Sequence, residues 1–157
     1  MASLIAAIAS LEIPRREWDD LLPNLSQNAE HEDFNIRMSS LTTLGYICEE
    51  IQPSDVTDPI KNGLILALIN NMSASQAAEN LTLTRIAARA LSYSIPFASQ
   101  NFRIQHERDY IMDRIFQAMD SNDEETQEYI LQCLAEISTQ EYEHLQHYFS
   151  RVCMLTQ

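Results

Sequence analysis

Apolar residues recur at intervals of three and four along almost the whole chain of 157 residues. This spacing places the apolar side chains on one side of a helix, so the pattern predicts a succession of amphipathic helices. Prolines and runs of small polar residues interrupt the pattern and mark the helix ends. The expected helices cover residues 3–11, 15–28, 31–51, 57–72, 81–98, 105–119, 125–138 and 142–156.

Several residues carry local expectations within this scheme. Pro23 is expected to bend the second helix, and Pro96 to kink the fifth near its end. Ser54 or Asp55 is the expected N-cap of the fourth helix. The core side of the last helix is expected to consist of Leu145, Tyr148, Phe149 and Val152.

The chain contains few residues that break helices. Two glycines and five prolines among 157 residues are too few for the many tight turns of an all-β protein. A hydrophobic content of 45% excludes a disordered tail. The sequence therefore predicts an all-α protein.

Four of the expected helices align with one another. Centring them on Ile8, Leu44, Leu91 and Leu134 gives spacings of 36, 47 and 43 residues, which suits paired-helix repeats of the HEAT type. The alternative is an ordinary helical bundle, which gives no reason for a position that is small in every helix. Such a position follows each centre, and it is occupied by Ala9, Gly45, Ser92 and Ala135.

Gly45 stands in the middle of the expected helix 31–51. Glycine inside a helix costs about 1 kcal/mol relative to alanine, so a packing constraint should offset the cost. We expect another helix to cross closely at the level of the small residues. A larger side chain at Gly45 should then be strongly destabilising.

The charge of the chain restricts its partners. Ten Lys and Arg residues against 23 Asp and Glu residues give a net charge of −13, which disfavours binding to nucleic acid. The apolar start of the chain lacks the basic region of a signal peptide. No later run approaches the ~20 apolar residues of a membrane helix, so we expect a soluble chain inside the cell.

Candidate catalytic and metal-binding residues are few. Cys48, Cys133 and Cys153 lie on apolar helix faces and are interpreted as buried thiols in a reducing compartment. Glu141 and His144 have the spacing of a di-iron ligand pair, but a di-iron bundle needs a second pair and two further glutamates. We expect no enzymatic activity, metal or cofactor.

Four segments resemble the importin-β (karyopherin-β) family of nuclear transport receptors. They are IAAIASLEIP (5–14), EWDDLLPNL (17–25), LTTLGYICEEIQP (41–53) and ERDYIMDRIFQAM (107–119). The resemblance implies a HEAT-repeat α-solenoid of antiparallel helix pairs, of which this chain is a piece covering about the third to seventh repeats. The implied limits are a truncated repeat at 1–13, full repeats at 14–53, 54–100 and 101–140, and a truncated repeat at 141–157.

The resemblance also implies a binding site. Receptors of this family bind phenylalanine-glycine motifs of nucleoporins between the outer helices of adjacent repeats. The stretch NGLILALINNM (62–72) agrees with this, because it is apolar on almost all sides and one side exceeds what a two-layer repeat can bury. The matching site residues are Ile65, Leu66 and Ile69 on one helix, and Glu107, Tyr110 and Ile111 on another.

Partners and location follow from the same resemblance. The whole receptor would bind FG-repeat nucleoporins, importin-α or basic cargo, and the GTPase Ran, in the cytoplasm, the nucleus and the nuclear pore. Nucleic acid and membranes are not expected partners, and exposed repeat ends could lead to self-association. The alternative function is a structural all-α scaffold or regulatory subunit that binds another peptide.

Overall fold

The computed structural model describes residues 1–73, 75, 77–148, 150–151 and 153. All regular structure in this part of the chain is helical, as predicted. The α-helices are α1 (Ala2–Glu12), α2 (Leu21–Asn28), α3 (Phe34–Glu50), α4 (Asp58–Asn70), α5 (Ala78–Ser94), α6 (Ser99–Arg103), α7 (Gln105–Met119), α8 (Glu124–Gln140) and α9 (Tyr142–Leu145). The 3-10 helices are η1 (Pro53–Asp55), η2 (Ile95–Ala98) and η3 (Gln146–Tyr148).

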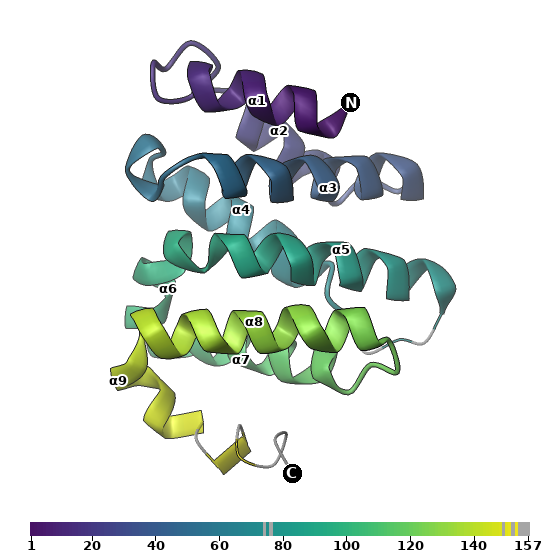
Figure 1. Ribbon diagram of the computed structural model, residues 1–157, viewed down its shortest axis with the longest axis vertical. Helices are drawn as coiled ribbons and strands as arrows, with labels where there is room; N and C mark the ends of the chain where they lie inside the picture. Colours follow the sequence, from purple (N-terminus) through teal and green to yellow (C-terminus); the bar gives the residue numbers. More distant parts are fainter. Residues whose placement is uncertain (74, 76, 149, 152, 154–157) are drawn as a thin grey trace.

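The helices form two layers (Figure 1). Helices α1, α3, α5 and α8 lie side by side in the front layer, and α2, α4, α6 and α7 lie behind them. Each long helix of the front layer packs against the next, and α2, α4 and α7 each also contact the front-layer helix that follows them. The three complete repeats expected from the sequence each contribute helices to both layers, although α6 crosses the expected limit at residue 100.

Aspartates fix the starts of two front-layer helices. Asp33 caps α3 by accepting hydrogen bonds from the backbone N–H groups of Asn35 (2.8 Å) and Ile36 (3.2 Å). Asp123 caps α8 by accepting from the N–H of Thr126 at 2.9 Å, and it also pairs with Arg85 of α5. The second cap therefore ties the start of α8 to its neighbour in the layer.

The expected helix over residues 15–28 is wrong in its first part. Helix α2 begins only at Leu21, and the preceding residues form turns in which Arg16 adopts a positive φ of 59°. Pro23 consequently lies in the first turn of α2, where its missing N–H costs no helical hydrogen bond. The expected bend in the middle of a longer helix is therefore wrong too.

Two other helix ends differ from expectation. The N-cap of α4 is Thr57, whereas Ser54 and Asp55 belong to η1, where Asp55 accepts a hydrogen bond from the N–H of Gln52 at 2.8 Å. Pro96 does not kink a helix that runs to residue 98. Instead α5 ends at Ser94 and the chain continues as the 3-10 helix η2, because proline cannot supply the next α-helical hydrogen bond.

The C-terminal segment is less regular than predicted. The expected helix 142–156 begins as α9 and continues as the 3-10 helix η3, and the described residues 150, 151 and 153 are α-helical, as expected. Leu145 is buried and Tyr148 packs against the core, as expected. The predicted core residues Phe149 and Val152, and the predicted helix end at Thr156, lie outside the described residues.

The structure shows what approaches Gly45. A Cβ atom added there would lie 3.1 Å from the Cβ of Ala90 and 3.3 Å from its Cα, so α3 and α5 meet almost backbone to backbone. Ala9, Gly45 and Ser92 are buried in the front layer, as the small-residue alignment predicted. Ala135 is exposed, however, because no further long helix among the described residues lies beyond α8 in this layer.

We predict that Gly45→Leu lowers the free energy of unfolding by about 1–3 kcal/mol or more, because the new side chain must displace Ala90 or its backbone. Chemical denaturation and thermal melting measure the effect.

The other glycine is a matched control for this substitution. Gly63 lies inside α4, and a Cβ there would meet nothing within 4 Å. Gly63→Ala should therefore stabilise the chain by up to about 1 kcal/mol through helix propensity alone. An unchanged melting temperature for Gly45→Leu would show that the two helices are not in close contact.

Candidate functional site

A cavity of about 300 Å³ opens between α4 and α7 in the back layer. It lies where apolar side chains of α4 face α7, the back-layer helix of the next repeat. All six site residues expected from the sequence line this one cavity, together with three further polar residues. The lining consists of Asn62, Ile65, Leu66, Ile69, Asn101, His106, Glu107, Tyr110 and Ile111.

Helix α4 supplies one apolar wall. Ile65 and Ile69 stand one turn apart and are 2% and 1% exposed, so they form the deep part of the wall. Leu66 is 50% exposed and stands at its edge. Positions 65, 66 and 69 share one side of the helix, because they are separated by one, three and four residues. The other apolar residues of α4 remain available to fill the core, so the helix can line a cavity as well.

Helix α7 supplies the opposite wall. Ile111 is buried, and Tyr110 is 40% exposed beside the opening. The tyrosine hydroxyl donates a hydrogen bond to Oδ1 of Asn70 on α4 at 2.9 Å. The guanidinium of Arg114 lies over the tyrosine ring, 5.3 Å from its centre. Tyr110 is therefore held in place from two sides at the rim.

Polar groups close the other end of the cavity. Asn101 on α6 donates hydrogen bonds from Nδ2 to Oδ1 of Asn62 (3.1 Å) and to Oε2 of Glu107 (3.0 Å). This brings a carboxylate, which accepts hydrogen bonds, to the mouth of an otherwise apolar slot. The arrangement can hold a compact apolar side chain and accept hydrogen bonds from the backbone that carries it.

Sequence reasoning missed Asn62, Asn101 and His106. Asn62 precedes Ile65 by three residues and His106 precedes Tyr110 by four, so helical spacing could have placed both beside the expected residues. Asn101 had no such signal, because it lies on the short helix α6, in a stretch for which no separate helix was predicted.

Comparisons with known proteins agree with one another. A family model described as IPO5-like, TPR repeats matches residues 1–155. Importin subunit beta-1 of Arabidopsis thaliana is 34% identical over 156 residues, and that of Saccharomyces cerevisiae is 31% identical over 153 residues. The chain belongs to the importin-β family.

Solved structures of this family extend the agreement to three dimensions. A crystal structure of importin β superposes with a TM-score of 0.82 at 31% identity, covering 96% of this chain and 17% of that one. A structure of Kap95p, whose binding induces the switch loops of RanGDP to adopt the GTP-bound conformation, gives a TM-score of 0.81 at 30% identity, covering 95% of this chain and 17% of that one. The predicted HEAT-repeat solenoid is thus confirmed. The two sequence matches include 99% and 96% of this chain. The chain spans only 18% and 17% of the length of these two relatives.

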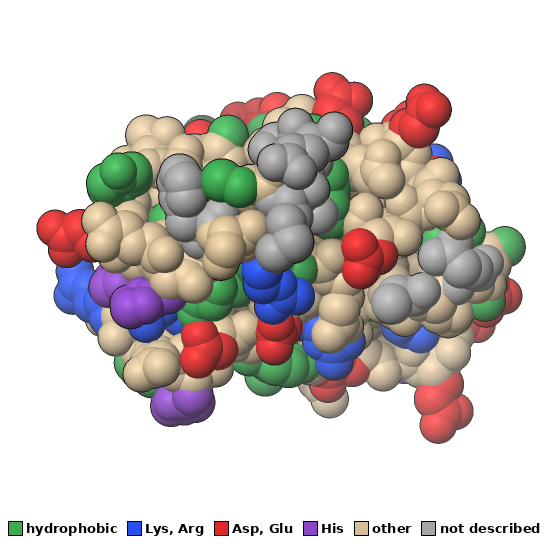
Figure 2. Space-filling model, turned by 90° about the horizontal axis from the view of Figure 1, so that it is seen from below, with side chains coloured by type: hydrophobic (Ala, Val, Ile, Leu, Met, Phe, Trp, Pro, Cys, Tyr) green, Lys and Arg blue, Asp and Glu red, His purple; other side chains and the backbone are tan. Residues whose placement is uncertain are grey.

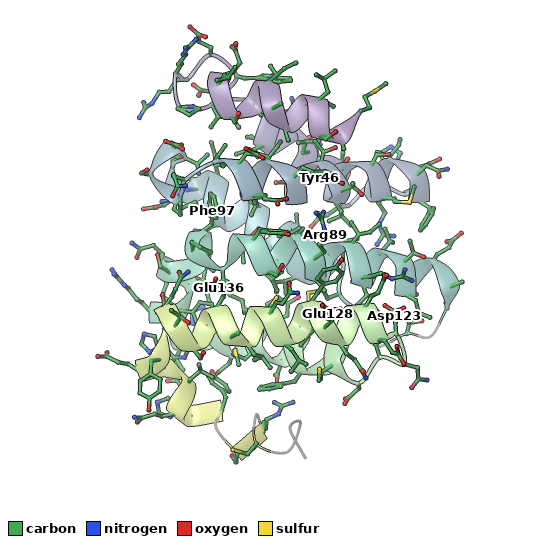
Figure 3. All side chains as sticks on the ribbon, in the orientation of Figure 1. Tyr46, Arg89, Phe97, Asp123, Glu128 and Glu136 are labelled. Atoms are coloured by element: carbon green, nitrogen blue, oxygen red, sulfur yellow. The ribbon has the colours of Figure 1, made fainter. Side chains whose placement is uncertain are left out.

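The front layer of this importin-β family chain carries a second cluster of polar and aromatic residues (Figure 3). The guanidinium of Arg89 on α5 lies 4.8 Å from the ring centre of Tyr46 on α3 and 5.5 Å from that of Tyr93. Arg89 also lies 3.7 Å from a carboxylate oxygen of Glu49. The cluster therefore joins α3 to α5. The positive charge of Arg89 also neutralises part of the acidic surface here, because Glu49 lies close to it.

The surface around the C-terminal segment mixes both signs of charge (Figure 2). Arg108, which is buried, donates from Nη1 to the carbonyl of Phe102 at 2.7 Å and lies 3.3 Å from Nδ1 of His144. His144 is 3.9 Å from Glu141, and burial raises the pKa of that carboxyl.

Among the described residues, no three His, Cys, Asp or Glu side chains are grouped so as to hold a metal ion, and no helix is long and apolar enough to cross a membrane.

Two of the three cysteines are buried, and the third is not. Burial raises the pKa of Cys48 to about 12, although a hydrogen bond with Ser94 acts in the opposite direction. Burial also raises the pKa of Cys133, whose Sγ lies 3.7 Å from the carbonyl of Ala88. Cys153 is exposed, so the expectation that all three are buried is wrong.

We predict that a thiol reagent at pH 8 labels the native chain at Cys153 and leaves Cys48 and Cys133 unmodified, because their thiols are protonated and covered. Cys153→Ser should abolish the rapid phase, and Cys48→Ser should leave it unchanged. Rapid native-state labelling of Cys48 or Cys133 would contradict the packing described for α3 and α8.

Proposed function

We propose that this chain belongs to a nuclear transport receptor and binds phenylalanine-glycine motifs of nucleoporins in the cavity between α4 and α7. One observation supports this most strongly. The six residues expected from the resemblance come from two helices about 40 positions apart in the sequence, and all six line one cavity. An apolar slot with a few acceptors at its edge has the chemistry that a phenylalanine side chain on a flexible peptide requires.

The dimensions of the cavity suit a single aromatic side chain. A volume of about 300 Å³ is at the lower end of ligand pockets in general. Burying one phenyl ring supplies little free energy beyond the entropic cost of ordering the peptide. Weak, rapidly reversible binding follows, with Kd values on the order of 0.1–1 mM.

Wider partners of the whole receptor are also proposed. Ran is supported by the likeness to Kap95p, and importin-α or basic cargo by the net charge of −13. These partners would place the protein in the cytoplasm, the nucleus and the nuclear pore. The exposed residues Leu4, Ile8 and Leu11 along α1 support the expected self-association through that end.

The cavity can be tested with a substitution that leaves the core intact. We expect Leu66→Asp to weaken binding of a phenylalanine-glycine peptide by about tenfold or more, because it puts a charge on the apolar wall. Leu66 is half exposed, so folding should be preserved, and NMR titration reads both the affinity and the fold.

Leu131 provides the matched control, since it is 44% exposed on α8, far from this cavity in the sequence and in the other layer. Leu131→Asp should bind the peptide like the unmodified chain, and a peptide with alanine in place of phenylalanine should bind neither. Equal binding by Leu66→Asp and the unmodified chain would exclude this cavity. The alternative, a scaffold for another peptide, would then take its place.

A further inference from the structure

Two hydrogen-bonded bridges between α4 and α7 close the cavity, one at each end. Asn101 forms the first by joining Asn62 to Glu107. Tyr110 forms the second by donating to Asn70. Asn62 and Asn70 are eight residues apart on α4, or about 12 Å at 1.5 Å per residue, whereas Glu107 and Tyr110 are three residues apart on α7, or about 4.5 Å. The slot between the two bridges therefore narrows from α4 toward α7.

Neighbouring groups determine the direction of the second bridge. Nδ2 of Asn70 donates to Oε1 of Glu30 at 3.1 Å, and a carboxylate can only accept. Oδ1 of Asn70 must therefore face Tyr110, whose hydroxyl donates to it. The same hydroxyl oxygen accepts from Nη2 of Arg114 at 3.3 Å, and Nη1 of Arg114 reaches the carbonyl of Met72 at 3.3 Å.

The hydroxyl group of Tyr110 is thus used both as a donor and as an acceptor. A phenylalanine at this position could make neither bond, and the side chain of Asn70 would lose its partner on α7. The bridge lies at the surface, where water competes for the same groups, so its contribution to stability is small. Its effect on the shape of the slot is direct, because it holds two side chains across the groove.

We propose that the Tyr110–Asn70 bridge is a specificity-determining element of the cavity: it restricts the ligand to one aromatic side chain whose neighbour at that end carries no bulky side chain. This inference rests on the proposed peptide-binding function. Consecutive residues of a peptide are about 3.8 Å apart, which is close to the ~4.5 Å between the bridge ends on α7, so a large side chain next to the bound phenylalanine meets a bridge there. Glycine does not, and exclusion by a fixed obstacle discriminates without adding affinity.

The test uses peptides of equal length with a single phenylalanine, in the contexts Gly-Phe-Gly, Leu-Phe-Gly and Gly-Phe-Leu. Each is titrated by NMR against the unmodified chain, Tyr110→Phe and Asn70→Ala. The unmodified chain should prefer the glycine context over at least one leucine context by about tenfold. Both variants should reduce that preference to about threefold or less, and the ratio of the Kd values for the glycine and leucine contexts is the readout.

Tyr142→Phe is the matched control, because it removes a tyrosine hydroxyl from a residue that is 63% exposed on α9. It should keep the full preference. A merely structural role of Tyr110 would weaken all three peptides alike and leave their ratio unchanged.

The outcomes separate this inference from the proposed function. If the unmodified chain binds Gly-Phe-Gly but Tyr110→Phe and Asn70→Ala keep its preference, the bridge does not determine specificity and the cavity assignment stands. A loss of preference in Tyr142→Phe as well would also overturn the inference. If the unmodified chain binds none of the peptides, the proposed function and this inference both fail.

Discussion

The close approach of α3 to α5 at Gly45 and Ala90 determines the spacing of the two repeats to which these helices belong. The front-layer helices meet there with almost no side chain between them, so the two repeats are fixed at their smallest separation. Every helix of the back layer is attached to this stack by a short connection. Helices α4 and α7 are followed by α5 and α8, so the width of the cavity depends on the packing of α5 against α8 on the opposite side of the molecule.

The two layers are joined by different kinds of interaction. In the front layer, fully buried residues such as Leu44 and Leu91 make an interlocked apolar core that is sensitive to volume. In the back layer, α4 and α7 meet partly through apolar walls and partly through hydrogen bonds, which are made by the buried Asn101 and by the partly exposed Tyr110. Such a division suits a scaffold whose shape is maintained on one side while a small ligand binds on the other.

Much of the fold could be predicted from the sequence because its signals are local. The three- and four-residue spacing predicts the long helices, and the small residue at Gly45 predicts a helix crossing, although it does not identify Ala90 as the residue on the other helix. The errors lie where local signals conflict with context. Residues 15–20 carry apolar and charged side chains compatible with a helix but form turns, and Pro96 ends a helix that the pattern alone continues. For the cavity, the resemblance supplied the apolar residues, whereas Asn101 and the pairing of Tyr110 with Asn70 depend on distances that no spacing rule contains.

The bridge at Tyr110 also has a mechanical consequence. Helices α3 and α5 cannot approach each other further at Gly45 without displacing Ala90, so a change in the angle between their repeats would move the back-layer helices relative to each other. Asn70 donates a hydrogen bond to Glu30 and accepts one from Tyr110, so these two hydrogen bonds join three successive segments of the back layer and would resist that movement. Because the cavity lies between two of these segments, its width is linked to the curvature of the array.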